Sequence, residues 1–456
     1  MFMATADLSQ APGSSRLSLQ RAIWRWHFYA GLLSVPFLIL LAITGSLYLF
    51  KGEINHTVFA YRTVVTETGT PALPPSALVA KAVAALPGST ATSFGEPASP
   101  AASAVVTVTT GDGPHLVYLN PYTGAVLATM RSDREPMYLL KKIHSLELFG
   151  TLANRLIEAI AGFALVLVVT GFYLWWPRGR SGGVLTVRAT PGRRIWWRDV
   201  HAVTGALAGL VIFFLALTGM PWSGFWGANL STYSAKLGIG FPAQLWDDVP
   251  KSALPTQAVL PNAGWAVENA PVPLSAPAAG AAPIGIDRAM AVAHGLGLAP
   301  GFEMALPSDG TGVYTAAIYF GDLSKERTVH IDQYSGKPIV DLGFKDYGPV
   351  GKAIEFGINV HQGMEWGLAN QLVMLATCLS IVLASVSAVV MWWKRRPAGK
   401  MGVPPYPADP GVFRFLWAAA VAVGIVFPIT GLAVLAMLAF DLLAIRTIPP
   451  LRRAFA

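Results

Sequence analysis

The chain has 456 residues, of which 53% are apolar and only 13% are charged, and its formal net charge is +8. Because soluble domains carry about 25% charged residues, this composition excludes an ordinary soluble protein and predicts a membrane protein with sizeable segments outside the bilayer. The positive charge does not predict a nucleic-acid partner, since the basic residues gather in short segments beside long apolar runs.

Five apolar runs are long enough to cross a lipid bilayer, whose core needs about 20 helical residues. Their predicted bounds are residues 28–50, 154–176, 201–222, 361–393 and 413–445. The segments 1–27, 177–200 and 394–412 are short and basic, which predicts a cytoplasmic location and a cytoplasmic N-terminus. Segments 51–153 and 223–360 are then external, and 446–456 is a tail. The first run is too long for a signal peptide and is read as an uncleaved anchor.

The first run begins beside His27, which is followed by Gly31 and Thr44. The external segment after it has helical spacing at 76–86 and strand-like alternation at 104–109. A turn at 120–124, with Asn first and Gly in the left-handed position, joins apolar stretches at 117–119 and 125–127. This segment is predicted to form a small helix-plus-hairpin domain.

The second run follows His144 and contains Glu158. A carboxylate inside a span is costly and is usually functional, and the alternative is a structural ion pair with Arg155. The run ends in Trp175 and Trp176, which are typical of an aromatic belt at a membrane interface.

The third run repeats the pattern of the first, because His201 is followed by Gly205 and Thr218 at the same intervals. The second external segment also repeats the first, with helical spacing at 286–298 and a strand at 313–320. A turn at 332–336 lies between stretches 329–331 and 338–340. Residues 251–283 are rich in Ala and Pro, which predicts a flexible or extended linker.

The fourth run follows His361 and contains Cys378, the single cysteine of the chain. One cysteine excludes an internal disulfide and a cysteine-ligated iron–sulfur cluster, and no C-x-x-C-H motif exists for covalent haem attachment. Any cofactor must therefore be held non-covalently. The last run is broken by Pro428, and two interpretations stay open. One is a kinked span plus an interfacial helix, which the spacing favours and which gives five spans in all. The other is a tight hairpin, which the basic tail favours and which gives six.

The histidines recur at matched positions of two tandem halves, each made of a span, an external segment and a span. Both halves start inside, so an axis along the membrane normal relates them. His27 and His201 lie at the inner ends of their spans, and His144 and His361 lie at the outer ends. Imidazoles are common axial ligands of haem iron, so each pair of histidines is predicted to bind one haem b. One haem would then lie near each face of the membrane.

Each of these features has a structural alternative. A lone histidine at a membrane interface is more often bound to lipid headgroups, and the matched repeat favours ligation here. Gly31 and Gly205 would leave room for a flat macrocycle, or they are ordinary close-packing glycines. The unmatched histidines are interpreted as surface or structural residues: His56, His115, His294 and His330.

The chain resembles the PepSY-associated transmembrane family over nearly its whole length. The motifs that carry the resemblance are Trp26-His27-x3-Gly31, the run 217–223, the two Tyr-Thr/Ser-Gly turns and the Trp-Trp-Pro-Arg and Trp-Trp-Lys-Arg ends. The resemblance implies a helical membrane bundle with two PepSY-like α+β external domains in a bacterial inner membrane. It also implies a haem-bearing reductase that passes electrons outward, often to Fe(III) chelated by a siderophore.

On this interpretation the protein is a di-haem transmembrane oxidoreductase, with His27, His201, His144 and His361 as axial ligands and Gly31 and Gly205 beside the cofactor. Its partners would be the lipid bilayer, a separate flavoprotein or quinol donor, and a periplasmic ferric chelate or other acceptor. The inner loops are too short to hold a fused flavin domain. The alternative is a membrane-anchored PepSY protein that binds or regulates others without redox activity. A transporter is disfavoured, because no interrupted helix pair marks a midplane site.

Overall fold

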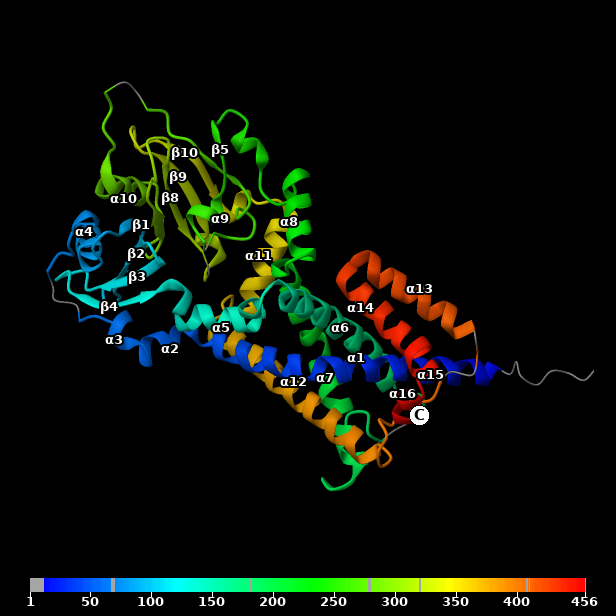
Figure 1. Cartoon of the computed structure of the whole chain (residues 1–456). Helices are drawn as coiled ribbons and strands as arrows, with labels where there is room; N and C mark the ends of the chain where they lie inside the picture. Colours follow the sequence, from blue (N-terminus) through cyan, green and yellow to red (C-terminus); the bar gives the residue numbers. More distant parts are fainter. Residues whose placement is uncertain are drawn as a thin grey trace, which may run out of the picture. The chain divides into compact units, whose positions relative to one another are not determined.

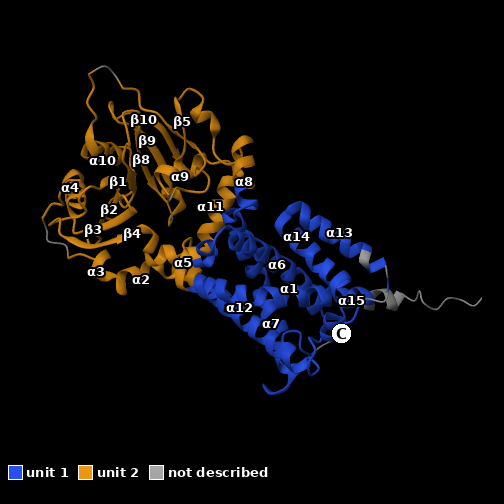
Figure 2. Ribbon diagram, in the orientation of Figure 1, with its two compact units in different colours: residues 1–46, 143–228, 372–456 blue, residues 47–142, 229–371 orange. Residues whose placement is uncertain are grey.

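A computed structural model describes residues 12–66, 70–179, 182–261, 263–277, 280–319, 321–406, 409 and 411–455, without the side chains of 12–17 and 413. Residue 320, at the end of one predicted strand, therefore lies outside the described residues. The chain divides into two compact units (Figure 2). Unit 1 holds residues 1–46, 143–228 and 372–456, and unit 2 holds residues 47–142 and 229–371.

Unit 1 is a helical bundle (Figure 1). Its main helices are α1 (Pro12–Leu49), α6 (Thr151–Trp175), α7 (Arg194–Gly219), α12 (Leu368–Arg395), α13 (Gly411–Val426) and α14 (Pro428–Ala439), and it ends in α15 (Ile445–Thr447) and α16 (Pro449–Phe455). Among the described residues, five helical stretches are long and apolar enough to cross a membrane: Ser18–Leu49, Thr151–Trp175, Arg194–Trp222, Leu368–Arg395 and Pro428–Thr447. The prediction of five spans is confirmed at this level.

Small residues let these helices approach one another closely. A Cβ atom added to Gly162 of α6 would lie 1.9 Å from the Thr430 hydroxyl of α14, and one added to Gly209 of α7 would lie 2.9 Å from the Phe172 ring. Ile160 and Phe163 are fully buried beside these contacts. Side-chain bulk at either glycine would separate the helices, as expected for small-residue packing between membrane helices.

The last apolar run forms a helical hairpin instead of one kinked span. Helices α13 and α14 lie side by side (Figure 1), and a Cβ atom added to Gly431 would lie 2.2 Å from the Cα atom of Gly424. The helix breaks at Phe427, whose φ of −128° and ψ of 82° are not helical, because the following Pro428 disfavours the α conformation there. Pro428 then occupies the first turn of α14, where a missing N–H costs nothing.

Unit 2 is built on one eight-stranded antiparallel sheet, with strand order β10-β9-β8-β7-β1-β2-β3-β4. The first segment supplies α4 (Pro75–Ala85), β1 (Thr90–Gly95), β2 (Ala104–Thr110), β3 (Gly113–Leu119) and β4 (Val126–Arg131). The second supplies α10 (Gly285–Gly295), β7 (Glu303–Ala305), β8 (Val313–Ile318), β9 (Arg327–Asp332) and β10 (Pro338–Gly343). Shorter helices are α2 (Lys51–Thr57), α3 (Ala60–Thr63) and α11 (Pro349–His361), and the boundary between the two units falls within α5 (Pro136–His144) and α8 (Trp226–Lys236).

The two predicted hairpin turns are confirmed. The Asn120 side chain accepts hydrogen bonds from the backbone N–H groups of Tyr122 and Thr123, and Gly124 has φ +70°. In the second turn the Asp332 side chain accepts hydrogen bonds from the backbone N–H groups of Tyr334 and Ser335, and Gly336 has φ +69°. Both turns are fixed by contacts within a few residues, which is why the sequence predicts them.

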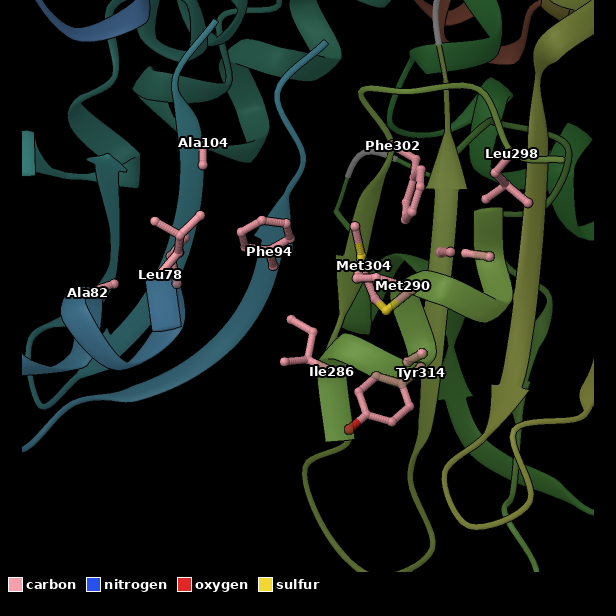
Figure 3. Packing of buried hydrophobic residues seen from close by; sticks show 14 of the residues in the cluster. Leu78, Ala82, Phe94, Ala104, Ile286, Met290, Leu298, Phe302, Met304 and Tyr314 are labelled. Atoms are coloured by element: carbon pink, nitrogen blue, oxygen red, sulfur yellow. The ribbon is translucent and has the colours of Figure 1, made fainter. Parts of the chain in front are cut away.

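The two segments that the sequence predicts to be external do not form two separate domains. Strand β1 of the first pairs with β7 of the second, with Phe94 opposite Met304. Helices α4 and α10 cover a shared core, which contains Leu78 and Ile286 of these helices together with Phe94 and Met304 (Figure 3). A small domain of about sixty residues buries a modest core alone, and joining the two sheets enlarges it.

Residues 251–283 were predicted to be a linker, and their described part is folded instead. It contains β5 (Lys251–Pro255), α9 (Thr256–Val259) and β6 (Pro271–Pro273). Trp265 and Val267 are 2% and 1% exposed, and Val267 packs in a core with Trp246 and Leu342. Burial of a few large apolar side chains therefore makes this segment fold in spite of its Ala/Pro-rich composition.

Unit 2 also buries carboxyl groups that no described cation pairs with. Glu355 and Glu326 are 0% and 5% exposed, and they accept hydrogen bonds from the hydroxyls of Tyr319 and Tyr347, each 2.9 Å long. Burial raises the pKa of both carboxyls well above the usual range, since a charge loses its hydration there. Burial and the nearby Glu355 raise the pKa of Glu268 to about 7.

These raised pKa values predict that the free energy of unfolding falls as the pH rises. From about pH 4.5 upward the unfolded carboxyls lose their protons while the folded ones keep theirs, which costs roughly 1.4 kcal/mol per pH unit and proton. We expect Glu326→Gln, which needs no proton, to make this decline shallower. Thermal unfolding of the full chain between pH 5 and 8 measures it. Glu147→Gln, at an exposed position, is the matched control, and parallel curves for Glu326→Gln and the unmodified chain would contradict the prediction.

Candidate functional site

Two of the predicted histidines face each other inside unit 1. His27 lies on α1 and His201 lies on α7, and the centres of their rings are 6.2 Å apart with an interplanar angle of 83°. Two imidazoles bound to opposite sides of one metal ion, with metal–nitrogen bonds of about 2 Å and roughly 1 Å from each nitrogen to its ring centre, would have centres about 6 Å apart. The observed spacing therefore fits a shared metal ion.

Hydrogen bonds fix which nitrogen of each ring can bind a metal. The Thr170 hydroxyl donates its single proton to the Val166 carbonyl at 2.6 Å, so at 2.9 Å it accepts the Nδ1 proton of His27. His201 Nδ1 donates to the Ala384 carbonyl at 2.9 Å, since a carbonyl can only accept. Both rings therefore keep the Nε2 lone pair for a ligand, as histidines in metal sites usually do.

A cavity of about 670 Å³ surrounds this histidine pair. Helices α1, α6, α7 and α12 all contribute to its lining, which is mostly apolar. Gly31 and Gly205 line it too, and a Cβ atom added to Gly205 would meet no atom within 4 Å. The volume lies within the range of about 300–1,000 Å³ that small-molecule and cofactor pockets have in proteins.

The segment after α6 lines one end of the cavity, which we call its mouth. Gly183 and Val184 line the cavity, and the Trp175 indole donates to the Val184 carbonyl at 2.9 Å. Asp199, which is fully buried in α7, accepts from the backbone N–H and Nε of Arg188 at 3.0 and 2.9 Å. These contacts anchor the segment, so that its backbone forms a wall of the cavity.

His144 has the same hydrogen-bonding pattern at another place in unit 1. Its Nδ1 donates at 2.8 Å to the Thr44 hydroxyl, which itself donates to the Leu40 carbonyl at 2.7 Å. Burial lowers the pKa of His144 to about 4, so the ring is neutral at pH 7, as a metal ligand must be. A Cβ atom added to Gly45 would lie 3.5 Å from the imidazole carbon Cε1.

His361 belongs to unit 2, so its pairing with His144 stays a prediction. It is the last residue of α11, and the span α12 begins at Leu368 and not at residue 361 as predicted. His144 likewise ends the separate helix α5 before α6 begins. The side-chain amides of Asn154 and Asn370 then bond to the carbonyls of Ser145 and Val360, tying each span to the end of the preceding helix.

The other ionisable residues singled out in the sequence have structural surroundings. Glu158 is 1% exposed and accepts from the backbone N–H groups of Phe225 and Trp226 at the start of α8, with Arg155 at 3.9 Å. An anion is stabilised at a helix N-terminus, which explains this buried carboxylate. His330 is buried and bonds to Thr315, whereas His56 is exposed.

The profile of the family described as PepSY-associated TM region matches residues 24–395. The chain belongs to this family. A PepSY-associated TM region protein with five long apolar helices is a multi-pass membrane protein. No curated protein matches the chain.

Two features of this site were not identified from the sequence. Thr170 is followed by Gly171, as Thr44 is followed by Gly45, and this repeated Thr-Gly pair is the signal that could have found it. The Ala384 acceptor is a backbone carbonyl that any residue would supply. The described residues hold no group of three or more His, Cys, Asp or Glu side chains placed to bind a metal ion.

Proposed function

We propose that this protein is a di-haem b membrane oxidoreductase that carries electrons from a donor on the cytoplasmic side to an acceptor outside, with a ferric chelate as the acceptor. The observation that carries the proposal is the His27–His201 pair, whose spacing and fixed Nδ1 protons suit two axial ligands. A haem held there would supply one-electron transfer.

The residues of the cavity would then bind and tune the cofactor. The apolar lining excludes water, and Gly205 leaves space for a flat ring beside α7. His144 and His361 are proposed as ligands of the second haem, supported by the neutral, Thr44-bonded state of His144. The internal repeat and the PepSY-like nature of the two halves of unit 2 belong to the same proposal.

The absorption spectrum of the purified full chain, together with haem quantitation, tests the proposed function. We expect the Soret and split visible bands of six-coordinate low-spin haem b, at about two haems per chain, and their change on reduction with dithionite. A chain expressed with haem supplied that carries no chromophore would overturn the proposal. That result would favour a membrane-anchored binding or regulatory protein.

Thr170 is expected to tune the inner haem through His27. Thr170→Val removes the acceptor of the Nδ1 proton, which makes the imidazole a weaker donor to ferric iron. We expect a higher midpoint potential and roughly 10-fold weaker haem binding. Thr170→Ser keeps the hydroxyl and is expected to behave like the unmodified chain. Spectroelectrochemical titration distinguishes the variants, and equal potentials for Val and Ser would contradict the role.

A further inference from the structure

The mouth of the unit 1 cavity carries arginines that the histidine pair does not explain. The arginines that line it are Arg21 of α1, Arg194 and Arg198 of α7, and Arg395 of α12. Farther along the same helices the lining is apolar, with Leu38 on α1, Ile212 on α7 and Ile381 on α12. The cavity is therefore amphipathic, with one basic end and one uncharged end.

Three of these guanidinium groups lack a carboxylate partner among the described residues. Arg198 forms an ion pair with Asp199, whereas Arg21, Arg194 and Arg395 form no such pair in the part of the chain that is described. Arg395 is held in place: it donates to the Gly402 carbonyl at 2.6 Å and lies 4.8 Å from the centre of the Trp24 ring. Its charge is thus positioned without being neutralised.

Arg194 and Arg395 line the same end of the cavity, so their like charges repel each other there. Because a guanidinium group does not lose its proton in proteins, this repulsion cannot be relieved by deprotonation. An anion between the two groups would relieve it, and a carboxylate is the anion whose two oxygens match the guanidinium geometry. An apolar cavity with such a rim fits a ligand that has an apolar body and carboxylates on one edge.

We propose that Arg194 and Arg395 bind the propionate carboxylates of the tetrapyrrole held by His27 and His201, and so fix its orientation in the cavity. This inference rests on the proposed function. It assigns the edge of the macrocycle that carries the carboxylates to the mouth, next to the segment containing Gly183 and Val184. The arginines are positioning residues, and the imidazoles hold the metal.

The test compares iron protoporphyrin IX with its dimethyl ester, which has the same apolar body and no carboxylates. Binding of both is measured to the full chain carrying His144→Ala, which removes the second proposed site. The variants are Arg194→Gln and Arg395→Gln, and Arg193→Gln is the matched control, because Arg193 is an exposed neighbour that does not line the cavity.

We expect the chain with both arginines to bind the acid at least roughly 10-fold more tightly than the ester, as charge-assisted bidentate bonds imply. Either glutamine variant should bring this ratio close to one while leaving ester binding unchanged, and Arg193→Gln should preserve it. An unchanged ratio in both variants overturns the proposal, and ester binding shows that the variants are folded. If neither porphyrin binds to the chain with both arginines, the proposed function itself fails.

Discussion

Replacing His201 by alanine is expected to reduce the haem content of the purified chain from about two to about one per molecule. In this variant His27 would be the one remaining protein ligand of that haem. Loss of one of two ligands from a non-covalent site removes most of the affinity of the site for haem. His27→Ala is expected to give the same loss. Haem quantitation by the pyridine haemochrome spectrum measures the effect.

The double substitution distinguishes a shared site from two separate ones. If His27 and His201 hold one haem, the double variant should lose no more haem than either single variant, because removing one ligand already empties the site. His56→Ala, at an exposed position of α2, should retain the full content. Added imidazole should restore the six-coordinate spectrum to His201→Gly. An unchanged haem content in all of the His27 and His201 variants would eliminate this pair as the ligands.

The sequence predicts the parts of this fold that depend on local chemistry. The turns at Asn120 and Asp332 are fixed within five residues, and the apolar runs are recognisable from length alone. It does not predict the pairing of β1 with β7, because β7 is only three residues long and its partner lies about two hundred residues away. The burial of Trp265 and Val267 was missed for the same reason: it depends on contacts made by the folded chain.

In the candidate site, too, the sequence predicts what a local pattern marks and does not predict which distant segments come together. Matched spacing identified His27 and His201, because a repeated side chain is visible in the sequence, and the structure brings their rings together. The acceptors that set their tautomers come from α6 and α12, and the sequence contains no signal for which turn of another helix lies beside an imidazole. Two interpretations of the Pro428 break were open, and close packing of Gly424 on Gly431 decides for the hairpin.

The same hairpin is held to α1 by a buried ion pair, and breaking it is expected to have the largest effect on stability. Arg25 and Asp441 are 4% and 5% exposed. Arg25 Nε donates to Asp441 Oδ2 at 2.9 Å, and the hydroxyls of Tyr29 and Tyr406 donate to Oδ1 at 2.7 and 3.1 Å. The Arg25 guanidinium carbon also lies 3.9 Å from the centre of the Tyr406 ring.

Asp441→Asn removes the negative charge and leaves the Arg25 guanidinium buried without a counter-ion. Removing one partner of a buried pair costs about 3–5 kcal/mol, because the remaining charge has lost its hydration. We expect the apparent Tm of the full chain to fall by roughly 10 °C. Hydrogen exchange should increase first in α13 and α14, since this network joins the hairpin to α1.

Two further variants separate the ion pair from simple disruption of the region. Arg446→Gln removes an exposed guanidinium that lies over the same Tyr406 ring, and it should change the Tm little, because exposed charges contribute about 0–1 kcal/mol. Arg25→Met combined with Asp441→Asn should be less destabilising than the sum of the single changes, because no unpaired charge stays buried in the double variant. Strict additivity would show that Arg25 and Asp441 stabilise the bundle independently, and the hairpin would then depend on apolar packing against Ile160 and Phe163.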